Sequence, residues 1–307
     1  MSAEPPRVLV IVGPTAVGKT NLALVLGPRF GGEVISADSR QVYRYMDIGT
    51  AKATPEERAL VPHHLIDIVD PDEELTLAHY RALATQAIEA VWARGRLPML
   101  VGGTGLYIWA VLEGWTIPEV PPDPSLRAAL EEEARQRGYA ALHARLAEVD
   151  PAAAARIDPR NVRRVIRALE VYCRAGVPIS RLQRREPPPY RVFIVGLTMP
   201  RPALYARIDA RVDRMIAQGL VEEVRWLRAR YADDLPAMSA LGYQQIVQYL
   251  RGEISLEEAM MLIKRHTRRF VRQQYNWFRL SDPRITWVDA HEADWAALEA
   301  QVARFLE

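Results

Sequence analysis

The sequence predicts an α/β fold in which a parallel-sheet core of the P-loop NTPase-like kind carries a helical insertion domain. Three observations lead to this class. The chain opens with a β-rich run, a phosphate-binding loop and a helical stretch, in that order. Further β-rich runs then alternate with helical ones, which is the pattern of parallel βαβ units. A long stretch of helical character interrupts this alternation in the middle of the chain.

The first predicted unit contains the phosphate-binding loop. The run RVLVIVG at 7–13 is apolar and β-rich, and the stretch at 19–30 has helical character. Between them the chain reads GPTAVGKT, a full G-x-x-x-x-G-K-[ST] loop made of Gly13, Pro14, Thr15, Ala16, Val17, Gly18, Lys19 and Thr20. Its backbone N–H groups and the helix N-terminus face an anion, the lysine adds a charge, and Thr20 can ligate Mg²⁺. We therefore expect this loop to bind a chain of phosphates.

Two more strands are expected before the insertion. The run GEVISADS at 32–39 resembles a buried strand with Asp38 at its carboxyl end. An amphipathic helix over 79–95 is expected to stop at Gly95, and LPMLVGGTGLY at 97–107 is a third buried strand that runs into glycines. Ligands of open α/β sheets bind beyond the carboxyl ends of the strands. Asp38 and the turn around Thr104 are therefore expected near the phosphate site.

The insertion is marked by a change of pattern. The proline-rich, acidic stretch at 116–125 is interpreted as a linker, and residues 124–182 are helical throughout. The β-rich run RVFIVGLTM at 191–199 could rejoin the sheet, and the rest of the chain is expected to be helical. The predicted boundaries are 1–120 and 186–307 for the core with its C-terminal helices, and 121–185 for the insertion.

Composition is that of an ordinary globular protein. The 307 residues carry a net charge of +2, so bulk charge does not by itself indicate a nucleic-acid partner. The one cysteine, Cys173, excludes an internal disulfide, and no Cys/His cluster has the spacing of a metal site. No apolar run is long enough to span a membrane, and the first residues lack the features of a signal peptide. We expect a cytoplasmic protein, a monomer, without structural zinc or a membrane partner.

The expected phosphate site differs from that of a nucleotide hydrolase. Only three of the 40 basic residues are lysines, and the loop keeps one of them, Lys19, where a compact ammonium on a flexible stem is needed. An ordinary ATPase or GTPase also carries a strand-end aspartate that helps to hold Mg²⁺. The strand at 97–107 ends in Gly-Gly-Thr-Gly instead. This argues against plain nucleotide hydrolysis, and the glycines permit either a tight turn or the close approach of a ligand.

Asp38 and the arginines each have two interpretations. Asp38 is a candidate general base beside the phosphates, and equally a helix-capping or turn aspartate. Arginines cluster at 160–167 and again in KRHTRRFVRQQYNWFR at 264–279, where they are mixed with aromatic side chains. Such mixtures suit RNA backbone contact and base stacking, whereas the alternative is a solvated basic helix. We expect Phe270, Trp277 and Phe278 to lie in the core.

A resemblance to a known family rests on several blocks. GPTAVGKT, ISADSRQVYRYMDIGTAK, HHLIDIVDP, LVGGTGLY, RALEVY and ALGYQQ occur in the order and spacing of the bacterial tRNA dimethylallyltransferases, also called tRNA isopentenyltransferases. The resemblance runs from about residue 7 to about residue 280, and the block at 38–52 is its most specific part. It implies transfer of the dimethylallyl group of dimethylallyl diphosphate to the exocyclic amino nitrogen of the adenosine 3′-adjacent to the anticodon, with release of diphosphate.

The resemblance also implies roles for particular residues. Asp38, Thr104 and Arg211 match catalytic positions, and the loop from Gly13 to Thr20 would bind the diphosphate with Mg²⁺ on Thr20. Matches to RNA-facing positions are Asp38, Ser39, Arg40, Gln41, Thr104, Arg127, Arg163, Arg164, Arg167, Gly242, Tyr243, Gln244, Arg268 and Arg272. The insertion would grip the anticodon stem-loop of tRNA. One departure concerns Gln273, which stands where the family commonly has a second basic residue.

Three alternatives remain open on the residues alone. A small-molecule kinase would use the arginine-rich insertion as a lid over phosphates. A non-catalytic RNA-binding protein could use the loop to bind a nucleotide that switches its activity. This alternative does not explain Asp38 and Thr104. A relative could prenylate free adenine nucleotides, although the basic insertion favours a macromolecular acceptor.

Overall fold

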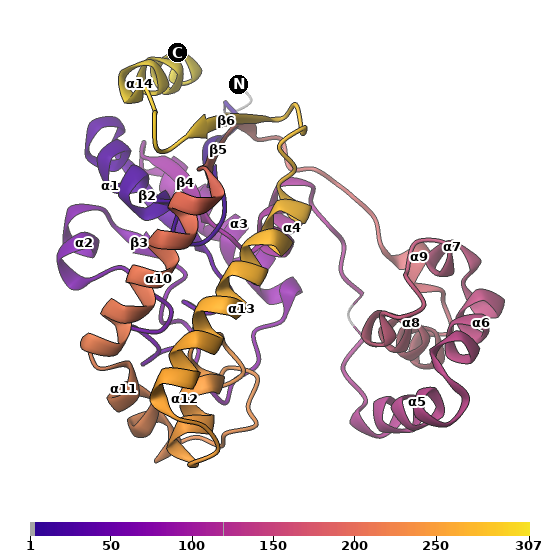
Figure 1. Ribbon diagram of the computed structural model, residues 1–307. Helices are drawn as coiled ribbons and strands as arrows, with labels where there is room; N and C mark the ends of the chain where they lie inside the picture. Colours follow the sequence, from indigo (N-terminus) through magenta and orange to yellow (C-terminus); the bar gives the residue numbers. More distant parts are fainter. Residues whose placement is uncertain (1–3, 119) are drawn as a thin grey trace. The chain divides into compact units, whose positions relative to one another are not determined.

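The computed structural model describes residues 4–118 and 120–307, and the chain divides into two compact units (Figure 1). The larger unit joins the residues up to Leu112 with those from Pro189 onward, and the smaller one is Glu113–Pro188. The sequence analysis placed these divisions at 120/121 and 185/186. The predicted linker at 116–125 includes residue 119, which lies outside the described residues, as do residues 1–3 of the predicted core.

The larger unit is built on one six-stranded sheet, in which every paired strand is parallel to its neighbours. Its order is β3-β2-β4-β1-β5-β6. The strands are β1 (Arg7–Val12), β2 (Gly32–Ala37), β3 (His63–His64), β4 (Leu97–Gly102), β5 (Arg191–Thr198) and β6 (Ile285–Asp289). Leu9 of β1 pairs with Met99 on one side and Phe193 on the other. The predicted α/β class with a parallel core is confirmed, and the run at 191–199 does rejoin the sheet.

Helices cover the sheet because its central strands are apolar on both faces. β2 and β4 are buried along their whole length, as expected for parallel strands packed between helices. The helices of this unit are α1 (Lys19–Phe30), α2 (Pro55–Leu60), α3 (Leu77–Ala93), α4 (Gly105–Leu112), α10 (Arg201–Ala217), α11 (Leu220–Arg228), α12 (Tyr243–Leu250), α13 (Leu256–Trp277) and α14 (Trp295–Leu306).

Local signals set several helix ends. α3 is followed by Gly95 in the left-handed region, at φ 70°, so the predicted stop at this glycine is confirmed. α13 begins with a capping box in which Ser255 and Glu258 satisfy each other's backbone N–H groups. α10 and α13 lie side by side in the larger unit (Figure 1). Leu204 and Ile208 of α10 and Val271 of α13 are buried in the same core cluster as Leu9 of β1.

The smaller unit is helical, and it has a core of its own. Its helices are α5 (Pro124–Arg137), α6 (Tyr139–Val149), α7 (Pro151–Ala154), α8 (Val162–Ala175) and α9 (Ile179–Leu182). Leu142, Leu146 and Val165 are fully buried within it. Asn161 caps the start of α8, and Gly176 ends the helix in the left-handed region.

Two expectations about the larger unit were wrong, and one short strand was not predicted. The chain after residue 199 is not helical to its end, because ITWVD at 285–289 adds β6 to the sheet beside β5. This run is β-rich, but it carries no site motif and follows a long helix. β3 has only two residues, too few for a periodic pattern. Phe270 is 38% exposed rather than in the core, whereas Phe278 is buried as predicted.

Candidate functional site

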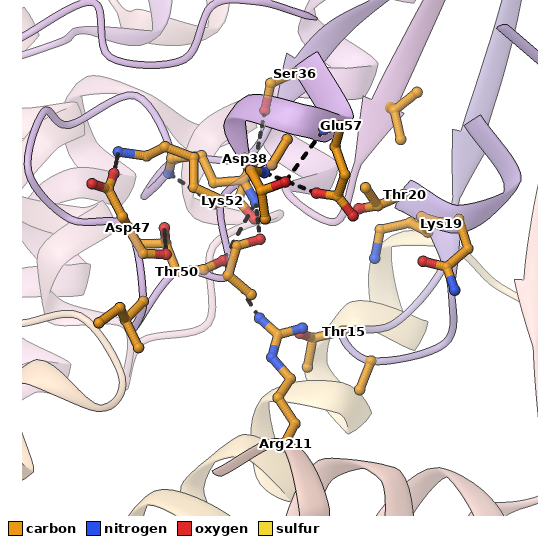
Figure 2. A pocket seen from close by; sticks show the side chains of 18 of the residues that line it. Thr15, Lys19, Thr20, Ser36, Asp38, Asp47, Thr50, Lys52, Glu57 and Arg211 are labelled. Atoms are coloured by element: carbon orange, nitrogen blue, oxygen red, sulfur yellow. Dashed lines mark hydrogen bonds and ion pairs between the residues drawn. The ribbon is translucent and has the colours of Figure 1, made fainter. Parts of the chain in front are cut away.

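A cavity of about 1130 Å³ lies where the phosphate loop, the segment after β2 and the end of β4 meet. The phosphate loop follows β1, Asp38 follows β2, and Gly102 ends β4, so all three line the cavity from strand ends. Arg211 reaches the same cavity from α10. Figure 2 shows Lys19 and Thr20 on one side, Asp38 across from them and Arg211 approaching from a helix. The larger unit alone thus supplies a pocket of the size of a small-ligand site.

The phosphate loop has a backbone shape that needs glycine. Gly13 and Gly18 have φ values of 140° and 113°, which L side chains rarely adopt. A Cβ on Gly13 would also lie 2.4 Å from the carbonyl oxygen of Leu197 in β5. Lys19 Nζ donates hydrogen bonds to the carbonyl oxygens of Gly13, at 3.0 Å, and Pro14, at 2.8 Å. The ammonium group is therefore held under the curve of the loop.

The electrostatics of the loop are set by burial and by two charged neighbours. Burial lowers the pKa of Lys19 to about 8, the Asp38 carboxylate opposes this shift, and the Arg211 guanidinium adds to it. Burial likewise lowers the pKa of Arg211, against the effect of Asp38. One carboxylate thus faces two cations that lack full hydration. Binding of an anion between these two cations is therefore electrostatically favourable.

Asp38 forms a turn and also faces the cavity. Its Oδ1 accepts hydrogen bonds from the backbone N–H of Arg40, at 2.8 Å, and of Gln41, at 3.4 Å. Among the described residues, no hydrogen bond to Oδ2 is found, although Asp38 lines the cavity. The turn interpretation and the base interpretation are therefore compatible, because one oxygen holds the loop and the second can accept a proton.

Thr104 ties the turn after β4 to the segment that carries Asp38. Its Oγ1 accepts a hydrogen bond from the backbone N–H of Ser39 at 3.0 Å, and its own N–H donates to the carbonyl of Ala37 at 3.1 Å. Gly102 leaves room for this contact, since a Cβ there would lie 2.1 Å from the Ala37 oxygen. The two strand ends are thus locked side by side next to Asp38.

α10 places a row of arginines along the cavity. Arg207 donates to the carbonyl oxygen of Val17 in the phosphate loop at 3.1 Å, and Arg211 to that of Thr50 at 3.4 Å. Arg214 lines the cavity one turn further along the helix. Three arginines spaced three or four residues apart on α10 therefore face the site.

An ion-pair network around the buried Lys52 supports the segment at 38–52. The side chain of Lys52 is 1% exposed and donates to Asp47 Oδ1 and Asp67 Oδ1, both at 2.6 Å, and to the Tyr43 carbonyl at 2.8 Å. Arg58 holds the other oxygen of Asp67 at 2.8 Å. Sequence analysis gave Lys52 no role. The available signal was that a chain so rich in arginine keeps one of its three lysines here.

The RNA-facing candidates of the larger unit differ in how accessible they are. Gln244 and Arg272 are exposed. Arg40 is bound to the Pro236 carbonyl at 2.7 Å, and Arg268 forms an ion pair with Asp209. Ser39 is partly exposed, and the side-chain amide of Gln41 donates hydrogen bonds to the carbonyl oxygens of Thr50 and Ala51. Gly242 is buried, and its φ angle is 95°.

Tyr243 is the candidate whose environment differs most from the expectation. It is fully buried, and its hydroxyl donates to Glu223 Oε1 at 2.5 Å. Glu223 also accepts the backbone N–H groups of Asp47, Ile48 and Gly49. Tyr243 therefore supports the 38–52 segment from inside the core and offers no surface to RNA in this structure.

The arginines of the smaller unit fall into two groups. Arg127 and Arg167 both bind Glu170, whose side chain has no exposure, at 2.8 and 2.5 Å. Their guanidinium groups thus neutralise a buried carboxylate within the unit. Arg163 and Arg164 are exposed on α8. Of the four arginines expected to contact RNA here, these two present their charge to solvent.

In residues 4–118 and 120–307, no helix is long and apolar enough to cross a membrane. Within the same ranges, no group of three or more His, Cys, Asp or Glu side chains could hold a metal ion.

Comparison with known proteins agrees with this architecture. The family described as IPP transferase matches residues 41–281, and the one described as isopentenyl transferase matches residues 6–63. A tRNA dimethylallyltransferase of Roseiflexus sp. (strain RS-1) is 57% identical, with 96% of this chain and 97% of the relative covered. One of Thermomicrobium roseum is 56% identical, with 94% and 88% covered.

Solved structures give the same result. The full-length tRNA isopentenylpyrophosphate transferase of Bacillus halodurans superposes with a TM-score of 0.72 at 45% identity, over 98% of this chain and 95% of that one. A eukaryotic dimethylallyltransferase described as acting on tRNA gives a TM-score of 0.79 at 27% identity, and the match covers 97% of this chain and 77% of that chain. The resemblance inferred from the motifs is confirmed. The chain belongs to the IPP transferase family, together with these tRNA dimethylallyltransferases.

Proposed function

We propose that this chain transfers the dimethylallyl group of dimethylallyl diphosphate to the exocyclic amino nitrogen of the adenosine 3′-adjacent to the anticodon of tRNA. One observation carries the proposal beyond family membership. The phosphate loop with Lys19, the carboxylate of Asp38 and the guanidinium of Arg211 line one cavity at the strand ends. An anionic leaving group and a proton acceptor are both needed for this reaction, and the cavity offers a place for each.

The reaction breaks the allylic carbon–oxygen bond and forms a carbon–nitrogen bond. The bonding electrons leave with the diphosphate, whose growing charge the loop N–H groups, Lys19 and Arg211 stabilise. The adenine nitrogen, once bonded to carbon, loses a proton, and Asp38 accepts it. Thr104 supports this arrangement, because its hydroxyl holds the Ser39 backbone beside Asp38. Diphosphate and the prenylated adenosine are the products.

The cavity also fits Mg²⁺, which is bound through oxygen ligands. The hydroxyl of Thr20 and the carboxylate of Asp38 line the same cavity, and both are oxygen donors. Thr20 would hold the ion together with oxygens of the diphosphate. When bound, Mg²⁺ supplies positive charge that favours departure of the diphosphate. Lys19 and the loop N–H groups would orient the leaving group.

The tRNA acceptor accounts for a set of exposed basic and polar side chains. Arg163 and Arg164 in the smaller unit, and Arg272 and Gln244 in the larger one, can contact phosphates of an anticodon stem-loop. The target adenosine must leave the loop stack to reach the cavity, which costs a few kcal/mol. Contacts elsewhere on the RNA offset this cost. Because tRNA is the acceptor, we place the protein in the cytoplasm.

A transfer assay tests the proposal. Purified protein is incubated with Mg²⁺, radiolabelled dimethylallyl diphosphate and unmodified tRNA that carries adenosine 3′ of the anticodon. Parallel reactions contain AMP, or tRNA with that adenosine changed to guanosine. Label in the adenosine-containing tRNA alone supports the proposal, whereas label in AMP identifies a nucleotide prenyltransferase. Folded protein that labels nothing but turns over ATP would favour a kinase.

A further inference from the structure

A buried glutamine of α13, Gln274, joins the two loops that meet at the cavity. Its side-chain Oε1 accepts a hydrogen bond from the backbone N–H of Thr15 in the phosphate loop, at 2.9 Å. Its Nε2 donates to the carbonyl oxygen of Gly103 in the turn after β4, at 3.1 Å. Gln274 is 4% exposed. Because one partner is a donor and the other an acceptor, both ends of the amide are used, and its orientation is fixed.

The space around the glutamine fits this contact closely. A Cβ on Gly103 would lie 2.3 Å from Nε2 of Gln274 and 3.6 Å from the carbonyl oxygen of Gly13. The turn after β4 therefore touches the phosphate loop at the point that the amide bridges. The φ of Gly103 lies outside the left-handed region. Glycine is therefore needed at position 103 because the turn lies so close to Gln274, and not because of its backbone conformation.

The C-terminal end of α13, which carries Gln274, is held in place by hydrogen bonds and by burial. The carbonyl of Trp277 accepts a hydrogen bond from Trp109 Nε1 at 3.1 Å, and the hydroxyls of Tyr275 and Thr198 lie 2.9 Å apart. Phe278 is 1% exposed. The helix end is thus anchored to α4 and β5, and it holds the amide at a fixed place.

We propose that Gln274 is a positioning residue that sets the distance between the diphosphate site and the acceptor site. This rests on the proposed function, in which the phosphate loop holds the leaving diphosphate and the turn with Thr104 lies beside Asp38. Each loop keeps contacts of its own without Gln274, namely Lys19 to Gly13 and Pro14, and Thr104 to Ser39. Loss of the amide removes their alignment and leaves each binding surface in place.

The test separates alignment from binding. Gln274→Met keeps the approximate volume but neither hydrogen bond, and we expect kcat for tRNA prenylation to fall about 100-fold, the effect of a misplacement of about 1 Å. The dissociation constant of dimethylallyl diphosphate, measured by calorimetry, should change less than about threefold. Gln273→Met is the matched control, since Gln273 is exposed on the same helix. It should keep the wild-type kcat.

Two further variants keep the test decisive if Gln274→Met folds poorly. Gly103→Ala inserts a methyl group 2.3 Å from Nε2, which forces the amide to move, and it should give the same fall in kcat with diphosphate binding preserved. Gln274→Glu can donate to the Gly103 carbonyl only when protonated. Its kcat relative to wild type should therefore rise as the pH is lowered from 8 to 6, which a merely structural role would not produce.

The outcomes distinguish this inference from the proposed function. Failure of the wild-type protein to prenylate tRNA would refute the proposed function. Wild-type transfer together with unchanged kcat in Gln274→Met and Gly103→Ala would overturn the positioning role alone. A loss confined to diphosphate affinity, with kcat unchanged, would also overturn it, because Gln274 would then serve only the phosphate loop.

Discussion

The lowered pKa of Lys19 makes diphosphate binding depend on pH in a range where most lysines do not titrate. Burial lowers this pKa to about 8, with the Asp38 carboxylate acting against the shift and the Arg211 guanidinium adding to it. Binding of an anion requires the charged ammonium. Raising the pH through 8 therefore removes the binding-competent form of the free protein.

The size of the effect follows from the proton equilibrium. With a pKa of about 8, roughly nine-tenths of Lys19 is protonated at pH 7 and roughly one-tenth at pH 9. The apparent dissociation constant scales with the inverse of the competent fraction, so it should rise about tenfold between these pH values. Titration of the ligand adds little to this pH dependence between pH 7 and 9, because the last proton of a phosphate group dissociates near pH 6.

Isothermal titration calorimetry with dimethylallyl diphosphate at pH 7, 8 and 9 measures this dependence. Repeating the pH 9 titration in buffers of different ionisation enthalpy should reveal uptake of nearly one proton on binding. Lys19→Arg is the control, since a guanidinium remains charged throughout and should give weaker but pH-independent affinity. An affinity that is equal at pH 7 and 9 in the wild-type protein would refute the reasoning.

Four further predictions concern the catalytic base, the RNA contacts and two ion pairs. Asp38→Asn should lower kcat by 10²- to 10⁴-fold with diphosphate affinity kept, and near-normal turnover would exclude Asp38 as the base. Arg163→Ala and Arg164→Ala should each reduce the slope of log affinity for tRNA against log salt by about 0.9, whereas unchanged slopes would place the RNA contact elsewhere. Lys52→Met should lower the free energy of unfolding by about 1.5 kcal/mol in denaturant titrations, because it removes the hydrogen bonds from the buried ammonium to Asp47, which is 60% exposed, and to Asp67, which keeps its ion pair with Arg58. Glu33 is buried, which raises its pKa, but hydrogen bonds from His64 and Arg94 outweigh this and leave the pKa below its usual value. Its stabilisation is therefore present above the unfolded-state pKa and lost as the pH falls through the folded-state pKa, so Glu33→Gln should cost about 2 kcal/mol at pH 7 and less below about pH 4.

The parts of the site that follow β1, β2 and β4 could be predicted from sequence because they are local. A strand of apolar residues, a glycine-rich loop and a helix are contiguous, and the carboxyl ends of parallel strands meet at one edge of the sheet. Asp38 and Lys19 were thus expected to lie close together, and the structure places both in one cavity. The sequence left Asp38 undecided between turn and base. The structure removes the conflict, because the turn uses only Oδ1.

Contacts that join distant segments could not be predicted in this way. Gln274 and Thr15 are 259 positions apart, and no local pattern indicates that the side chain of Gln274 reaches the phosphate loop. The same holds for the smaller unit, where a cluster of arginines suggested a uniform RNA surface. Arg127 and Arg167 instead form ion pairs with Glu170, because a buried carboxylate needs cationic partners. A charge pattern gives the number of cations, but only the packing decides which of them face solvent.

The same phosphate loop that serves phosphoryl transfer in other proteins can serve prenyl transfer here, because both reactions develop negative charge on a phosphate chain. Loop N–H groups and a lysine stabilise that charge whichever bond breaks. What differs is the group across the cavity. A carboxylate close enough to shift the pKa of both Lys19 and Arg211 lies there, and the strand that would carry a metal-binding aspartate ends at Gly102, which Gly103 follows. In the proposed reaction the loop would hold the leaving group and the segments after β2 and β4 would face the acceptor, so the chemistry would depend on how rigidly the two are held together.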